Sequence, residues 1–290
     1  MKMLARAKAK YRLYKPLIKP LQTGLLVITG LTGYVSARCP MLTTGTILSL
    51  AASLFLAISG STILNMWWDR DIDALMKRTQ RRSTAAGQVT PNETLLLGLL
   101  VAGLGLAWAF SLDLLFGSVV AAGLFFDVVV YTIWLKRRTA WSILWGGLAG
   151  GMPILAGRAL GAGRIDTIGL VLALAVLFWI PTHIMTFNLR HQEDYDRAGV
   201  PTFPSAYGVH TTHITIALSS VLAAIAMGLG AYGIRLTWGY MRLLFVLSGG
   251  LLILAIYSMT NPSLRLNFGL FKYASLYMLG SMLMMAGGVL

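Results

Sequence analysis

The sequence predicts an all-α, polytopic membrane protein with nine transmembrane helices around a central cavity. Two observations support this fold class. Hydrophobic residues fill 57% of the 290 positions and charged residues only 12%, about half the charged share of a typical soluble domain. Apolar segments also continue from residue 21 to the C-terminus without a polar domain between them. We therefore interpret residues 1–290 as one membrane domain embedded in a lipid bilayer.

Nine apolar segments are long enough to cross a bilayer, whose hydrocarbon core of about 30 Å requires roughly 20 residues per helix. The expected spans are residues 21–37, 45–66, 93–112, 114–135, 141–158, 166–188, 213–232, 242–259 and 270–290. The break between the third and fourth spans rests on Ser111, Asp113 and Gly117, which interrupt a run too long for one helix.

Basic residues predict how the spans are oriented. Lys and Arg gather in residues 1–20 and in the connections that follow even-numbered spans, near residues 69–82, 136–138 and 188–213. The positive-inside rule then puts the N-terminus in the cytoplasm and the C-terminus outside the cell membrane. Residues 1–20 are expected to form a basic cytoplasmic lead-in, either lying on the lipid headgroups or solvated. Because the net charge of +14 is explained by this pattern, we expect no nucleic-acid partner.

Acidic residues are rare and clustered. Six of the ten fall in two short windows, at the cytoplasmic ends of the second and sixth spans. They are Asp69, Asp71, Asp73, Glu193, Asp194 and Asp196. If the second span continues as a helix, Asn65, Asp69 and Asp73 recur every four residues and share one face. Carboxylates clustered at the edge of hydrocarbon are costly unless a cation neutralises them, and Mg²⁺ binds through one or two carboxylates together with substrate phosphates.

Two facing acidic clusters could therefore hold a pair of Mg²⁺ ions with a diphosphate between them. Basic residues on the same membrane face could add positive charge to bind the diphosphate; these are Lys77, Arg78, Lys136, Arg137 and Arg190. In the structural alternative, the acids only form surface ion pairs with Arg70, Arg190 and Arg197. A cation-coupled transporter is an alternative of another class, but transporters place such sites near the bilayer midplane, whereas these clusters lie at its edge.

An allylic diphosphate suits such a site, because its anionic end belongs at the aqueous edge and its apolar tail among the helices. Metal ions withdraw charge from the leaving group and favour ionisation to an allylic cation. A dry cavity rich in aromatic side chains would then favour attack by an acceptor over capture by water. The predicted reaction class is prenyl transfer.

Several segments carry a family resemblance. Residues 65–79, NMWWDRDIDALMKRT, resemble the first aspartate-rich motif of the UbiA superfamily of intramembrane prenyltransferases. Three further segments, residues 131–139, 146–153 and 193–201, are similar to its haem-farnesylating branch, the protoheme IX farnesyltransferases. The matches follow the family's order over most of the chain.

This resemblance implies a nine-helix bundle, Mg²⁺ as cofactor, farnesyl diphosphate as donor and haem B as the substrate that is converted to haem O. By position, Asn65, Asp69 and Asp73 would hold one metal ion, and Glu193 with Asp194 the other. Asp196 fits the same cluster. Asp69, Asp73 and Asp194 would be the catalytic members of the set. Relatives that prenylate a quinone precursor or a lipid alcohol share the acidic motifs, so both acceptors remain alternatives.

Three residues within the spans are candidates for binding the acceptor. His183 lies inside the sixth span, where it could ligate haem iron or bond to a neighbouring helix. Asp127 lies inside the fourth span and could orient the acceptor or pair with Arg158. Tyr131 lies closer to the cytoplasmic end of the same span, where its ring could line the cavity.

Overall fold

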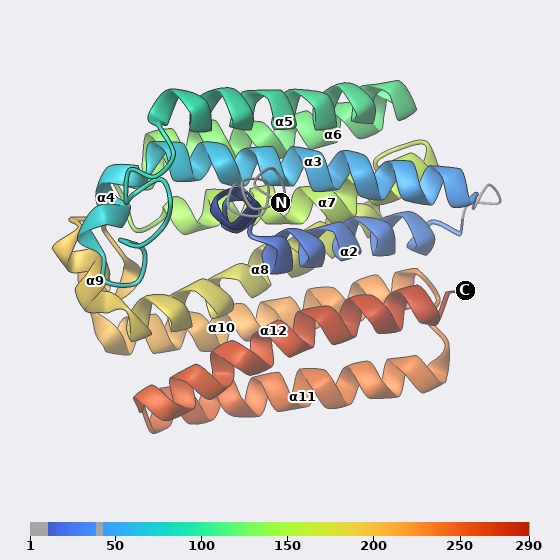
Figure 1. The fold of residues 1–290 in the computed structure, drawn as a ribbon. Coiled ribbons are helices and arrows are strands. Elements are labelled where there is room, and N and C mark those ends of the chain that lie inside the picture. Colours follow the sequence, from blue (N-terminus) through green and yellow to red (C-terminus); the bar gives the residue numbers. More distant parts are fainter. Residues whose placement is uncertain (1–10, 39–42, 290) are drawn as a thin grey trace, which may run out of the picture.

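The computed structural model describes residues 11–38 and 43–289, and every regular element in these ranges is helical. The long helices are α2 (Pro20–Ser36), α3 (Thr44–Trp68), α5 (Pro91–Leu112), α6 (Leu114–Leu124) continued by η2 (Phe125–Leu135), α7 (Ser142–Ala162), α8 (Thr167–Arg190), α10 (Phe203–Gly233), α11 (Trp238–Thr260) and α12 (Leu264–Gly287). Three short elements are η1 (Lys15–Ile18), α4 (Arg70–Leu75) and α9 (Gln192–Arg197). The long helices lie side by side in one bundle (Figure 1).

Seven of these helical segments are long and apolar enough to cross a membrane: α3, α5, α6 with η2, α7, α8, α10 and α11. The other two lie within the same bundle (Figure 1). However, α2 has only 17 residues, and α12 carries Arg265, Asn267 and Lys272 in its first turns. The all-helical membrane fold is therefore confirmed, whereas seven of the nine expected spans meet both criteria.

The break between the third and fourth predicted spans is sharp. Asp113 has an extended backbone, and its carboxylate accepts a hydrogen bond from the backbone N–H of Phe116 at 2.8 Å. Such a side-chain cap satisfies one of the free donors at the start of a helix. Asp113 thus ends α5 and begins α6, at the position that the sequence predicted.

Helix α7 contributes buried residues to both apolar cores. The first core joins it to α2, α3, α5 and α6, and the second to α8, α10, α11 and α12. Glycine permits the close packing of α2 on α7: a Cβ atom added at Gly157 would lie 1.9 Å from the carbonyl oxygen of Gly30. Small residues allow helix backbones to approach in this way within membranes.

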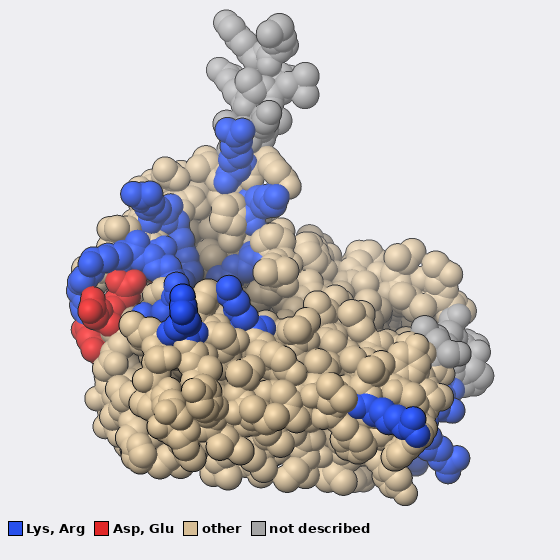
Figure 2. Space-filling model, turned by 90° about the horizontal axis from the view of Figure 1, so that it is seen from below, with Lys and Arg blue, Asp and Glu red and all other residues tan. Residues whose placement is uncertain are grey.

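The ends of the bundle differ in charge. The short helices α4 and α9 lie together at one end, and the C-terminus lies at the other (Figure 1). On the face seen in Figure 2, Lys and Arg side chains gather mainly around a hollow at the end that also holds the visible Asp and Glu side chains. The connections after α3, η2 and α8 therefore share one side, as the positive-inside pattern predicted.

Residues 11–19 of the basic lead-in dock on the bundle. Leu17 is buried against Ile63 and Met66 of α3, and the Tyr14 hydroxyl donates a hydrogen bond to Glu93 of α5. The position of the lead-in relative to the lipid headgroups stays a prediction, and residues 1–10 lie outside the described ranges. Helix α2 follows directly and begins at Pro20, with Lys19 as its N-cap residue.

Candidate active site

The first acidic cluster keeps its helical register across the junction of α3 and α4. The backbone N–H of Asp69 donates to the Asn65 carbonyl at 2.9 Å, and that of Asp73 donates to the Asp69 carbonyl at 2.8 Å. These are i to i−4 bonds, as in an uninterrupted α-helix. Asn65, Asp69 and Asp73 therefore share one face, as predicted from their four-residue spacing.

The acids of this cluster are held by basic side chains. Lys136 pairs with Asp69, and Arg82 pairs with Asp73 at 2.6 Å; both carboxylate side chains are only 6% exposed. Asp69 Oδ1 is also buried, and it has no hydrogen-bond partner among the described residues. An orphaned buried carboxylate oxygen is unusual and requires an explanation.

Asp71 differs, since its side chain is 62% exposed and pairs with Arg137 at 2.7 Å. The hydrogen bond from Arg137 lowers the pKa of this carboxyl group. The structural alternative of a surface ion pair therefore describes Asp71, although its partner is Arg137. The Arg70 side chain instead donates to the carbonyl of Trp67.

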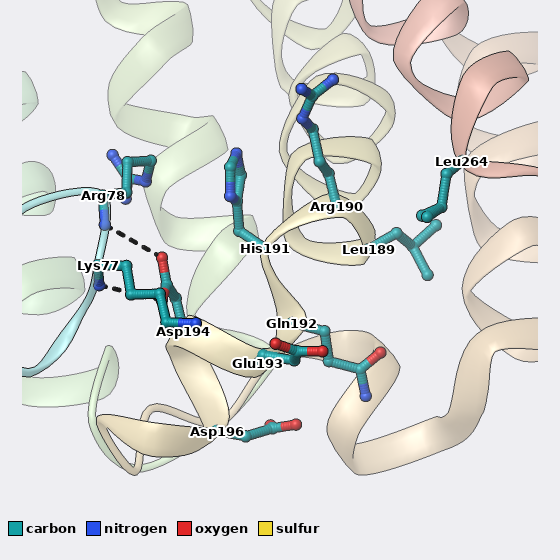
Figure 3. Close-up of a pocket in the computed structure, with 10 residues that line it drawn as sticks. All are labelled: Lys77, Arg78, Leu189, Arg190, His191, Gln192, Glu193, Asp194, Asp196 and Leu264. Atoms are coloured by element: carbon teal, nitrogen blue, oxygen red, sulfur yellow. Dashed lines mark hydrogen bonds between the residues drawn. The ribbon is translucent and has the colours of Figure 1, made fainter.

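The second acidic cluster begins at Glu193, three residues after the last residue of α8. Asp194 is buried, and its two carboxylate oxygens accept hydrogen bonds from the backbone N–H groups of Lys77 and Arg78, at 3.0 and 3.3 Å (Figure 3). Glu193 is exposed, and Asp196 accepts a hydrogen bond from Ser205. Arg197 lies 3.7 Å from Asp194. The cluster is thus attached to the connection that follows α4.

Apolar contacts bring the two clusters together. Ile72 and Met76, in and after α4, form a buried cluster with Val200, and Tyr195 of α9 packs against it. In the described ranges, no three His, Cys, Asp or Glu side chains converge closely enough to hold a metal ion by themselves.

A cavity of about 740 Å³ opens beside the second cluster. It lies between the end of α8, the connection after α4 and the start of α12 (Figure 3). Three of the five predicted diphosphate-binding residues line it, namely Lys77, Arg78 and Arg190. The Arg78 guanidinium lies 4.9 Å from the Phe187 ring centre, and that of Arg190 lies 3.7 Å from the Phe268 ring centre. The other two predicted residues, Lys136 and Arg137, pair with carboxylates of the first cluster.

Of the acceptor candidates, His183 contacts a neighbouring helix, and Tyr131 lies beside the residue that follows its own helix. The His183 ring stacks between Trp179 and Phe271, with ring centres 4.8 and 4.5 Å away, and its Nδ1 lies 3.3 Å from the Ser275 hydroxyl. It therefore makes the inter-helix bond that was the structural alternative. The Tyr131 ring lies beside Lys136, whose Nζ is 5.8 Å from the ring centre.

Asp127 contacts the first acidic cluster. Its Oδ2 accepts hydrogen bonds from Ser61 and, at 2.9 Å, from Nδ2 of Asn65. The predicted alternative of a pair with Arg158 is wrong, because Arg158 forms a bidentate pair with Asp166 near the other end of α7.

Sequence reasoning missed two basic residues at this site, Arg82 and Lys19. The ammonium group of Lys19 lies within electrostatic range of Asp73 and Asp127, and also of Arg82 and Lys136. Burial, followed by the positive charge of Arg82 and Lys136, lowers the pKa of Lys19 to about 8. Lys19 has a left-handed backbone (φ 40°), which is uncommon for a residue other than glycine. In the sequence, only its place directly before the first apolar run sets it apart from the other lead-in cations.

Residues 26–277 match the sequence model of the UbiA prenyltransferase family. The chain belongs to this family. The resemblance found in the motifs is thus confirmed, as is the prediction that the protein is a prenyltransferase. Similar proteins include the protoheme IX farnesyltransferase of Archaeoglobus fulgidus, 44% identical over 71% of this chain and 74% of the relative. That of Symbiobacterium thermophilum is 40% identical over 78% of this chain and 77% of the relative.

Solved structures of family members share the fold. A digeranylgeranylglyceryl phosphate synthase superposes with a TM-score of 0.79 at 18% identity, covering 97% of this chain and 99% of that one. A UbiA homolog from Archaeoglobus fulgidus, bound to GPP and Mg²⁺, gives a TM-score of 0.66 at 15% identity, covering 95% and 98%. At these identities the likeness concerns the fold alone.

Proposed function

We propose that this prenyltransferase transfers a farnesyl group from farnesyl diphosphate to a vinyl group of haem B, giving haem O, in a Mg²⁺-dependent reaction. One observation carries the proposal. The two acidic clusters, residues 69–73 (the first acidic turn) and 193–196 (the second acidic turn), pack together beside a basic cavity at one end of a membrane bundle. The curated relatives at 40–44% identity, which are protoheme IX farnesyltransferases, support haem B as the acceptor.

The residues of the two turns fit Mg²⁺, which prefers carboxylate and amide oxygens. The partnerless Oδ1 of Asp69 is an available donor of this kind. We assign Asn65, Asp69 and Asp73 to one ion, and Glu193 and Asp194 to the other, with Asp196 adding negative charge. Bound Mg²⁺ would supply positive charge that stabilises the leaving diphosphate.

Basic side chains would bind the diphosphate oxygens. Lys77, Arg78 and Arg190 line the cavity, and charge-assisted hydrogen bonds to phosphate oxygens are among the strongest that proteins make. Lys136 and Arg82 contact carboxylates of the first turn, so they lie within reach of an anion held there. Arg137 would add charge near Asp71, at the rim.

The reaction balances with one water molecule. The bond between C1 of the farnesyl group and the diphosphate oxygen breaks, and diphosphate leaves with the electron pair. The electron pair of the vinyl group then forms a bond to C1. Water adds to the resulting cation and loses a proton, which leaves the hydroxyl group of haem O. The apolar helices protect the allylic cation from water until the vinyl group has reacted.

His183 and Tyr131 are our proposed acceptor contacts. His183 belongs to a run of neighbouring aromatic rings that continues from Trp179 through Phe271 and Phe187 towards the cavity residue His191. A flat tetrapyrrole suits such aromatic surroundings. We also propose that the acidic end faces the cytoplasm, because basic connections gather there.

The acceptor is tested by offering three candidates to the purified protein in detergent, with Mg²⁺ and farnesyl diphosphate. Haem B, an aromatic quinone precursor and a lipid alcohol are supplied separately, and products are identified by mass spectrometry. We expect a prenylated product from haem B alone, and none when Asp69 is replaced by Ala. Prenylation of either other acceptor, with haem B unchanged, would contradict the haem assignment and retain the reaction class.

A further inference from the structure

One neighbouring helix holds both ends of the Asn65 amide. Nδ2 of Asn65 donates to Asp127 Oδ2 at 2.9 Å, and Oδ1 accepts from the Thr132 hydroxyl at 2.9 Å. Both partners belong to η2. Thr132 is fully buried, and Ser61 of α3 also donates to Asp127 Oδ2.

These two partners allow only one orientation of the amide. A carboxylate only accepts hydrogen bonds, so the NH₂ group must face Asp127. A flipped amide would set Oδ1 of Asn65 against Oδ2 of Asp127, two acceptors in contact. In the observed orientation Oδ1 has two lone pairs, of which Thr132 takes one. The other is free to bind a cation.

The form of η2 makes this arrangement possible. It is a π-helix of 11 residues, and the backbone N–H of Lys136 donates to the Tyr131 carbonyl, five residues earlier, at 2.8 Å. In an α-helix, Asp127 and Thr132 would point roughly 140° apart, since each residue turns the chain by about 100°. A π-helix, with its i to i+5 hydrogen bonds, has a wider turn, so residues five apart lie closer to one face. Lys136, which directly follows η2, pairs with Asp69.

We propose that Asp127 and Thr132 are positioning residues: they orient Asn65 so that its Oδ1 faces the metal ion of the first acidic turn. The inference rests on the Mg²⁺ site of the proposed function and replaces an acceptor-orienting role for Asp127. Outer-shell partners of this kind typically matter 10- to 100-fold for metal affinity.

The test measures Mn²⁺ binding to the purified protein in detergent by electron paramagnetic resonance, with the same concentration of inorganic diphosphate in every sample to complete the site and with no prenyl or haem substrate present. We expect Asp127→Asn to weaken Mn²⁺ binding about 10-fold, because an amide at position 127 lets the Asn65 amide bond in either orientation. Thr132→Val should weaken it less, since only one end of the Asn65 amide is released. The double variant Asn65→Asp/Asp127→Asn should bind Mn²⁺ within about threefold of the parent, because the amide introduced at position 127 then donates to the carboxylate introduced at position 65.

Asp113→Asn is the matched control, since it neutralises a carboxylate that caps α6 and should leave Mn²⁺ binding unchanged. Thermal unfolding of each variant separates lost folding from lost metal affinity. The proposal would be overturned if Asp127→Asn bound Mn²⁺ as tightly as the parent protein. It would also be overturned if the double variant bound Mn²⁺ no more tightly than Asp127→Asn alone. A parent protein that binds Mn²⁺ no more tightly than Asp69→Ala would also overturn it, because the first acidic turn would then hold no metal ion. A failure of the haem assignment alone would leave all these results intact, because haem is absent.

Discussion

The two acidic turns have the same plan in sequence and different surroundings in space. Each ends a long helix and continues into a helix of six residues, α4 or α9. In the first turn, Asp69 pairs with Lys136, which directly follows η2, and Asp73 pairs with Arg82 of the connection after α4. In the second, backbone N–H groups hold Asp194, and Glu193 is exposed at an open cavity.

This difference suggests that the two turns have separate roles, the first in the chemical step and the second in binding farnesyl diphosphate. The carboxylates of the first turn are fixed by ion pairs before any substrate binds, which is how a site is preorganised for charge. The second turn is attached to the backbone of Lys77 and Arg78, two predicted diphosphate ligands. We therefore expect changes in the first turn to affect mainly kcat, and changes in the second to affect mainly the KM for farnesyl diphosphate.

Loss of Asp69 should have the largest effect. Asp69→Ala removes the partnerless Oδ1 and the partner of Lys136, and we expect kcat to fall about 1,000-fold, the upper range for loss of one group that stabilises developing charge. Steady-state release of diphosphate measures kcat. Asp69→Asn keeps the shape and one acceptor oxygen for Lys136, and thermal unfolding of both variants shows whether an unpaired buried Lys136 has unfolded the protein instead. A change in the KM for farnesyl diphosphate with kcat unaltered would contradict the role of the first turn in the chemical step.

Asp194→Ala should act through the donor substrate. The substitution frees the N–H groups of Lys77 and Arg78, so the connection that carries both cations loses its attachment. We expect the KM for farnesyl diphosphate to rise about 100-fold, the scale of two charge-assisted hydrogen bonds, with a smaller change in kcat. Glu193→Gln, in the same turn but exposed, should raise the KM less. An equal rise in KM for the two variants would show that the hydrogen bonds from the Lys77 and Arg78 backbone to Asp194 do not contribute to binding farnesyl diphosphate.

The lowered pKa of Lys19 leads us to expect that activity depends on pH. Its pKa of about 8 lies below the ordinary lysine value because of burial and the nearby Arg82 and Lys136, and despite Asp73 and Asp127. The ammonium group is therefore charged at pH 7 and loses its proton as the pH rises through 8. We expect kcat/KM for farnesyl diphosphate to fall about 10-fold between pH 7 and 9.5, the value of one charged hydrogen bond.

Lys19→Arg keeps its charge throughout this range and should flatten the profile, whereas Lys19→Ala should show the low value at both pH values. A profile for Lys19→Arg that falls like that of the parent would exclude Lys19 as the titrating group.

Asp71→Asn should have the smallest effect. Asp71 lies between two proposed ligands in sequence but points away from their face, is largely exposed and pairs with Arg137. Exposed ion pairs contribute little, so we expect kcat and KM to stay within about threefold of the parent values. A loss of kcat as large as that of Asp69→Ala would show that the site is not restricted to the face shared by Asn65, Asp69 and Asp73.

Much of the fold was predictable from local patterns. Hydrophobic runs indicated the helices, the charge distribution indicated which connections share a side, and Asp113 marked the break between α5 and α6. The four-residue spacing of Asn65, Asp69 and Asp73 also indicated their common face. These features depend on composition and helical period alone, which a sequence displays directly.

Other features depend on packing between distant segments. The sequence FFDVVVYTIWL of η2 is as apolar as its α-helical neighbours, so nothing in it distinguished a π-helix, and the role of Asp127 depends on that helix type. Lys19 likewise appeared to be one cation among several, because its entry into the site follows from the docking of Leu17 on α3. Both misses have the same cause, since tertiary contacts decided the local conformation.

The most direct test of the central claim is mass spectrometry of haem extracted after the purified protein is incubated with haem B and farnesyl diphosphate, with Mg²⁺ supplied or chelated. We expect the mass of haem O with Mg²⁺ and unchanged haem B without it. Haem O formed equally after chelation, or haem B unchanged in both samples while farnesyl diphosphate is consumed, would contradict the account.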